Sequence, residues 1–115
     1  MKLVILFIFS VLSFSVFGQE DIKLSFKNDY EDVYHLSLII FTPDGKGQTR
    51  VSNVAPNTIK EYKFPVGTEI YVADNKQEEF AMKGNDIRKT NAKPCLVVSI
   101  TDKNRIILLT SVKQK

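Results

Sequence analysis

The sequence has a single cysteine, Cys95, among its 115 residues, which excludes an intramolecular disulfide. The fold must therefore be held by a hydrophobic core, even in an oxidising compartment. The sequence also has no tryptophan and no Asn-x-Ser/Thr glycosylation site. Because exported bacterial domains of this size often lack disulfides, these absences favour a bacterial source.

Groups that carry chemistry are equally sparse. His35 is the only histidine, which excludes two-histidine zinc motifs, and a Cys/His nucleophile pair would require His35 to meet Cys95. We expect instead that His35 lies on the less buried face of a strand and that Cys95 is a small packing residue. Glu78 and Glu79 are expected to be solvated charges. The five glycines form no phosphate-binding loop, and the sequence predicts no catalytic residue, no metal site and no cofactor.

Residues 1–18 are typical of a cleavable signal peptide. Lys2 supplies a positive start, an apolar run follows, and Gly18 is the small residue before the cleavage site. The apolar run is shorter than the roughly 20 residues that a membrane-spanning helix needs. We therefore expect cleavage between Gly18 and Gln19, a periplasmic or secreted location, and no stable membrane insertion of the mature chain, residues 19–115.

Several segments of the mature chain alternate apolar and polar residues with the period of two that is typical of a half-buried strand. The first is 22–26. The second, 33–41, is apolar on both faces, which predicts a central strand. Pro43-Asp44-Gly45 then favours a tight turn. Further strands are expected at 48–54, around Tyr62 and Phe64, and at 68–73.

Two apolar segments near the C-terminus, 96–101 and 105–110, are expected to pair as a hairpin. The residues between them are Asp102, Lys103 and Asn104, which suit a short loop with Asn104 in the left-handed conformation. Such a hairpin would place aliphatic residues on both of its faces, as in the interior of two packed sheets.

These segments together predict an all-β fold of about seven strands in one domain. The preferred form is a single antiparallel β-sandwich, immunoglobulin-like or related, and a small β-barrel is the alternative. Little helix is expected. Only 74–90 lacks strand alternation, and within it 77–82 suits a strand end or one helical turn, ended by Gly84-Asn85.

Two stretches carry a family resemblance: FKNDYEDVYHLSLIIFTPDG at 26–45 and NVAPNTIKEYKFPVGTEIYVAD at 53–74. Their succession of strands and turns, including Pro65-Val66-Gly67, resembles that of small exported β-sandwich proteins of Gram-negative bacteria. The resemblance implies the fold and the compartment. It includes no catalytic signature, so it implies no active site.

The segment 83–93, KGNDIRKTNAK, is the best candidate for a binding surface. It contains one acidic residue and four basic residues, which are Lys83, Arg88, Lys89 and Lys93. Loops between strands are common binding platforms, and a cationic loop suits an acidic glycan or an acidic patch on an envelope or extracellular protein. An ordinary solvated loop is the alternative.

The sequence thus favours an exported, noncatalytic binding or structural domain. The alternative is a small secreted enzyme of the hydrolase class, with a site assembled from scattered serine, threonine, tyrosine and carboxylate side chains. A nucleic-acid partner is not expected, because the whole chain has 16 basic and 13 acidic residues and loses one basic residue with the signal peptide.

Overall fold

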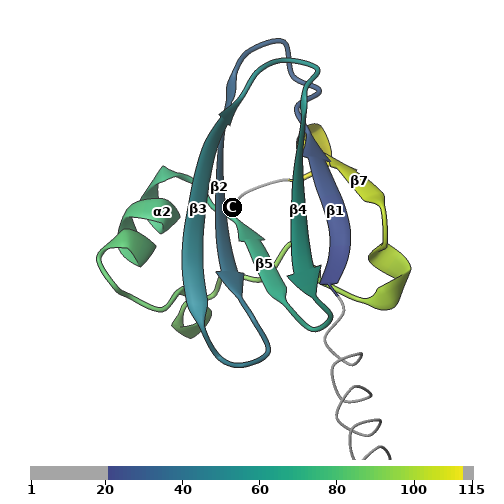
Figure 1. The fold of residues 1–115 in the computed structure, drawn as a ribbon. Coiled ribbons are helices and arrows are strands. Elements are labelled where there is room, and N and C mark those ends of the chain that lie inside the picture. The colour runs from purple at the N-terminus through teal and green to yellow at the C-terminus, as the bar shows by residue number, and fades with distance from the viewer. Residues whose placement is uncertain (1–20, 113–115) are drawn as a thin grey trace, which may run out of the picture.

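The structure is a computed structural model that describes residues 21–112 (Figure 1). The predicted signal peptide, residues 1–18, lies outside the described residues. The described chain is mostly β and forms two separate sheets. Among residues 21–112, no helix has the length and apolar character needed to cross a membrane.

Seven strands make up the two sheets. The three-stranded sheet has the order β4 (Ile59–Pro65), β1 (Asp21–Lys27), β7 (Arg105–Leu108), and the four-stranded sheet has the order β3 (Gly47–Val54), β2 (Tyr34–Phe41), β5 (Glu69–Val72), β6 (Leu96–Val97). The separation of the sheets excludes a closed barrel. Every pair is antiparallel except β1 with β7, which is parallel, so the prediction of a wholly antiparallel fold is wrong in this respect.

Side-chain alternation decides which face of each strand is buried. Ile22, Leu24 and Phe26 of β1 are at most 1% exposed, whereas Asp21 and Lys23, on the other face, are exposed. The inward residues of both sheets meet in one hydrophobic cluster, whose main members are Ile22, Leu24, Phe26, Tyr62, Phe64, Ile107, Leu36, Leu38, Ile40, Ile70 and Val72. The two sheets therefore face each other across one core.

Strand β2 is central, as the sequence predicts. It pairs with β3 on one side and β5 on the other. Its second apolar face contributes Ile39 to a smaller cluster on the outer side of the four-stranded sheet, together with Tyr71, Ala73 and Ile87. The outer face of the four-stranded sheet is therefore also apolar, and a third layer of the fold buries it.

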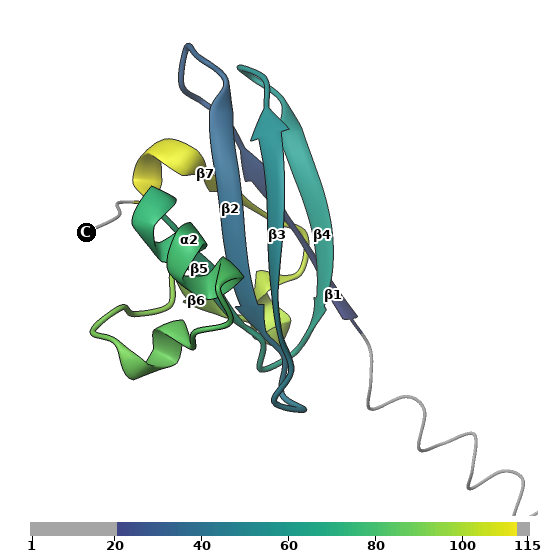
Figure 2. The same ribbon diagram turned by 90° about the vertical axis from the view of Figure 1, so that its left-hand side faces the viewer.

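The third layer consists of α2 (Asn75–Met82) and the short helix η2 (Ile87–Lys89), which cover that outer face (Figures 1 and 2). Asp74 begins α2 with a capping box: its side chain accepts from the Gln77 amide at 2.8 Å, and its own amide donates to Gln77 Oε1 at 3.0 Å. The helix ends before Gly84, whose φ is +91°. The single helical turn allowed by the sequence is thus an eight-residue helix.

The predicted hairpin between 96–101 and 105–110 is wrong. Strand β6 pairs with β5, whereas β7 pairs with β1 in the other sheet. Between them the chain forms η3 (Ile100–Asp102), after which the Asn104 amide donates to Lys23 O at 2.7 Å. Asn104 is left-handed as expected, with φ +62°, but it directs the chain into the opposite sheet.

Asp102 explains why this segment crosses between the sheets. Its carboxylate accepts from the Ser99 amide at 2.8 Å and from Arg105 Nη1 at 3.0 Å, so it caps η3 and is unavailable to a hairpin turn. Burial disfavours its ionised form, but the bonds from Ser99 and Arg105 outweigh burial and hold the Asp102 pKa below its ordinary value. The Ser99-x-x-Asp102 spacing is a capping signature that the sequence does contain.

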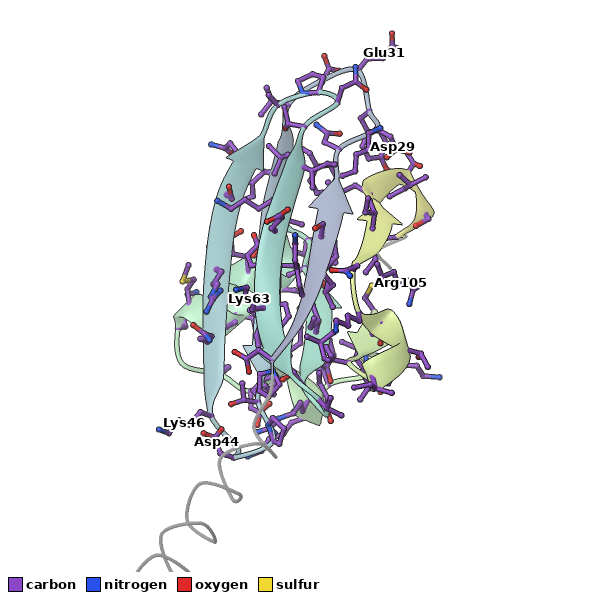
Figure 3. The ribbon with its side chains drawn as sticks, turned by 45° about the vertical axis from the view of Figure 1, so that its right-hand side comes forward. Asp29, Glu31, Asp44, Lys46, Lys63 and Arg105 are labelled. Atoms are coloured by element: carbon purple, nitrogen blue, oxygen red, sulfur yellow. The ribbon has the colours of Figure 1, made fainter. Side chains whose placement is uncertain are left out.

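Asp29 holds the other end of this segment. After β7 the chain forms η4 (Leu109–Ser111), and Asp29 accepts from the Thr110 amide at 3.0 Å and from the Thr110 hydroxyl at 2.5 Å. Figure 3 shows Asp29 beside this turn. The hydrogen bond from the Thr110 hydroxyl is the main cause of the lowered pKa of Asp29. The C-terminal segment is therefore attached by a carboxylate at each end of β7.

Candidate functional site

The four cations of segment 83–93 do not line one common hollow. Lys83 follows α2, with its Nζ 4.0 Å from Glu79 Oε1. Arg88 and Lys89 lie in η2, and Lys93 lies beyond it on the way to β6. Two of them line hollows in the surface, but not the same hollow: Arg88 lines one and Lys93 lines another.

Arg88 is engaged within the protein. Its guanidinium carbon lies 4.0 Å from the centre of the Phe41 ring, and its Nη2 lies 2.8 Å from Asp86 Oδ2. The hydrogen bond from the Arg88 side chain, followed by one from the Arg88 amide, lowers the pKa of Asp86 to about 2. These contacts hold η2 against the four-stranded sheet, so Arg88 has a structural role in addition to its charge.

The hollow beside Arg88 lies between α2 and the outer face of β2 and β3. Its volume is about 420 Å³, and apolar residues such as Ile39, Phe41 and Met82 line it. The charged residues that line it are Asp86 and Arg88, which pair with each other. This hollow therefore offers a ligand little unpaired charge.

The second hollow lies between the two sheets on the side where β6 and β7 are the outermost strands. Its volume is about 380 Å³. Lys93 and Arg105 line it and no acidic residue does, although Arg105 also bonds Asp102 outside the lining. Its aliphatic lining residues are Val72, Leu96, Ile107 and Val112. We call it the cationic hollow. Arg105 lies on β7, at the opposite edge of the three-stranded sheet from Lys63 on β4 (Figure 3).

Cys95 also lines the cationic hollow and is exposed. The expectation that it is a small packing residue is therefore wrong. Solvent reaches the side chain, yet the protein around the sulfur desolvates a thiolate: burial raises the Cys95 pKa, and the charge of Arg105 offsets only part of this effect. At neutral pH the lining of the hollow thus includes a neutral thiol as well as two cationic side chains.

His35 is exposed and lies on the less buried face of β2, as predicted, but it is not free. Its Nε2 lies 2.7 Å from Glu78 Oε1 of α2, and its Nδ1 lies 3.1 Å from Asn53 Oδ1 of β3. Glu78 is therefore a bonded carboxylate and not the solvated charge that the sequence suggested. The hydrogen bond that His35 donates to Glu78, and then the one to Asn53, raises the pKa of His35. This contact joins α2 to the sheet.

Neither His35 nor its neighbours form an accessible catalytic arrangement. Ser37 follows His35 on the same face of β2, but it is 0% exposed, and its hydroxyl has no hydrogen-bond partner among residues 21–112. A substrate cannot reach it beneath the third layer. Within residues 21–112, no group of three or more histidine, cysteine, aspartate or glutamate side chains is placed to hold a metal ion.

Sequence reasoning singled out Lys93 but missed Arg105 and Cys95 as members of the same hollow. Arg105 was expected to begin the second strand of a hairpin, and that pairing would have directed it elsewhere. No local pattern brings Lys93 and Arg105 together, because their proximity depends on the crossover between the two sheets. The Ser99-x-x-Asp102 capping pattern was the available signal that 96–110 is not a hairpin.

Comparison of the chain with known protein families, with curated proteins and with solved structures found no significant match. Functional inference therefore depends on the geometry and charge of the cationic hollow.

Proposed function

We propose that the protein is an exported, noncatalytic β-sandwich of the immunoglobulin-like or a related type, which binds an acidic segment of another envelope or extracellular protein in its cationic hollow. The observation that carries this proposal is the placement of Lys93 and Arg105 in one hollow that no acidic residue lines. Arg105 is bonded to Asp102 through Nη1, so Lys93 supplies most of the charge available to a ligand. The signal-like residues 1–18 support export, and two sheets around a shared core support the sandwich.

An acidic protein segment suits this hollow better than an acidic glycan does. Both ligands could pair with Lys93, but exposed aliphatic side chains lie next to the hollow on β7, with Ile106 53% and Leu108 43% exposed. These side chains favour a ligand that offers apolar side chains next to its carboxylates. A glycan would leave them in contact with hydroxyl groups.

Binding is also a better account of the site than catalysis. A nucleophile needs an adjacent base or a lowered pKa, whereas burial raises the pKa of Cys95. Both ring nitrogens of His35 are occupied, one by Glu78 and one by Asn53. The residues of the cationic hollow therefore supply charge and contact area but no activated group.

The charge requirement can be tested with peptides and mature protein, residues 19–115. The probe is a peptide of roughly ten residues with valine at alternate positions, threonine between them and two glutamates near one end. Its control has lysine in place of glutamate. We expect the glutamate peptide to bind more tightly, and we expect Lys93→Glu to weaken it roughly fivefold at low salt, since exposed charge pairs contribute modestly.

Lys89→Glu is the matched control, because Lys89 is exposed, lies in the same segment and does not line the hollow. It should leave the affinity for the glutamate peptide almost unchanged. Equal affinity for the glutamate and lysine peptides would contradict the proposal. Binding of an oligogalacturonate, with no binding of either peptide, would assign the hollow to an acidic glycan instead.

A further inference from the structure

We infer that the bound segment is extended and adds to the free edge of β7 as a fourth strand of the three-stranded sheet. This inference rests on the proposed function, because it specifies how the acidic segment is held. Strand addition supplies affinity through main-chain hydrogen bonds and specificity through alternate side chains. Three features of the β7 edge support it: its lack of protection, its position over the cationic hollow, and the charge around it.

The edges of the two sheets differ in their protection. An exposed edge strand is normally blunted by charges, by proline or by its short length. Strand β4 carries Lys60, Glu61 and Lys63 and ends at Pro65, and β6 has only two residues. Strand β3 is predominantly polar apart from its two valines. Each of these edges resists pairing with another chain.

Strand β7 has the sequence Arg105-Ile106-Ile107-Leu108. It is twice as long as β6, and beyond its first residue it carries neither a charge nor a proline. Ile106 is 53% exposed and Leu108 is 43% exposed. Within residues 21–112, β7 pairs only with β1 and ends the three-stranded sheet. Its other edge thus presents main-chain groups flanked by exposed aliphatic side chains, which is the arrangement that accepts an added strand.

The cationic hollow lies where the side chains of an added strand would enter. Arg105 and Ile107 pair with Leu24 and Phe26 of β1, so they face the space between the sheets, while Ile106 and Leu108 face outward. Alternate side chains of a strand beside β7 would point into the hollow, towards Ile107 and Leu96, and the others would lie along Ile106 and Leu108. One extended segment can therefore satisfy both the edge and the hollow.

Charge selects the kind of segment that fits. Lys93, together with the part of the Arg105 guanidinium that Asp102 does not bond, favours carboxylates at inward positions near the start of β7. A second copy paired through β7 would bring two such cationic hollows together, and like charges oppose that contact. The last residues of this chain include Lys113 and Lys115, which have the same sign as the hollow. An acidic and apolar segment of another protein is the complementary occupant.

Backbone methylation of the probe distinguishes strand addition from recognition by side chains alone. Two versions of the glutamate peptide are N-methylated, one at the odd-numbered residues and one at the even-numbered residues. Because successive amides of a strand point to opposite sides, only one of the two versions carries its methyl groups on the side that faces β7. Strand addition predicts that one version loses at least about tenfold in affinity, while the other binds nearly as the unmodified peptide does. The unmodified peptide should also slow hydrogen exchange at those amides of 105–108 that exchange rapidly in the free protein.

The remaining outcomes separate this inference from the proposed function. If both methylated peptides bind as the unmodified one does, and 105–108 exchange is unchanged, strand addition is overturned while acidic recognition stands. If the unmodified peptide binds no better than its lysine control, both proposals are overturned. If the protein alone forms dimers in sedimentation, with 105–108 already protected, the occupant of the edge is a second copy.

Discussion

Residues 21–73 and residues 96–112 fill the same core but reach it in different ways. In the first region, strands pair through long antiparallel ladders: β1 and β4 are matched along seven residue pairs, and β2 and β3 along eight. In the second, β6 contributes two pairs to one sheet and β7 contributes four to the other. The first region is thus held mainly by main-chain hydrogen bonds, and the second depends on side-chain contacts.

The side-chain contacts of the second region are specific. Asp102 holds the crossover through Ser99 and Arg105, and Asp29 holds η4 through Thr110. Segments with few ladder bonds open at lower free energy than central strands do. The cationic hollow and the free edge of β7 therefore belong to the less constrained part of the molecule, where a binding surface can adjust to its partner.

The largest expected effect comes from a core residue of the first region. Leu38 is 0% exposed in the core between the sheets, and Leu38→Ala should lower the free energy of unfolding by about 2–5 kcal/mol through the cavity it leaves. Leu108→Ala is the control, because Leu108 is 43% exposed and its replacement should cost roughly 0.5 kcal/mol. Urea unfolding measures both. Similar losses would mean that the two regions do not differ as described.

A smaller effect is expected where the second region is attached. Asp102→Ala removes the cap of η3 and the partner of Arg105, and it should cost about 2 kcal/mol, as expected for hydrogen bonds to a charged group. Hydrogen exchange should accelerate in 96–108 and remain slow in β2 and β3. Uniform acceleration across both sheets would contradict the proposed difference in attachment.

Asp102 also predicts acid sensitivity of the second region. Its pKa is lowered in the folded protein, so its contribution to stability is present above the ordinary value of 3.8 and is lost as the pH falls through the folded pKa. Hydrogen-exchange protection in 96–108 of the wild-type protein should therefore decrease as the pH is lowered. In Asp102→Ala, the same change of pH should reduce protection less, because the variant has no Asp102 carboxylate to protonate.

The smallest effect concerns the third layer, which is joined to the sheet by His35 and Glu78. The proton NMR titration of His35 is unambiguous because it is the only histidine, and its pKa should lie above 6.5, the ordinary value. Glu78→Gln should move the pKa back towards that value, whereas Glu79→Gln, a change at an exposed neighbour, should not. A histidine pKa that Glu78→Gln leaves unchanged would exclude the contact in solution.

The sign of this pH effect follows from the raised pKa. The stabilising contact between His35 and Glu78 is fully present below the unfolded pKa near 6.5 and is lost as the pH rises through the folded value. As the pH rises through this window, the melting temperature of the wild-type protein should therefore decrease more than that of His35→Gln. The decrease should be small, because His35 is exposed.

Several features of the fold were predictable because they depend on neighbours in the sequence. The alternation at 22–26 and 33–41 correctly identified β1 and the two apolar faces of β2, and Pro43-Asp44-Gly45 correctly predicted a turn, in which Gly45 has φ +88°. The same reasoning placed His35 on the less buried face of its strand. It could not identify Glu78 as the partner of His35, since that contact needs α2 to lie across β2.

The sequence by itself determined the period of each strand, the position of the turns and the sign of the charge at Lys93 and Arg105. Only the tertiary structure decided that 96–101 and 105–110 belong to different sheets and that these two cations share one hollow. The physical reason is the range of the interactions. Alternation and turn chemistry act between near neighbours, whereas the choice of a strand's partner depends on burial against distant residues. That choice was made by Asp102, which bonds Ser99 and Arg105, and by the fit of Ile107 beside Phe26.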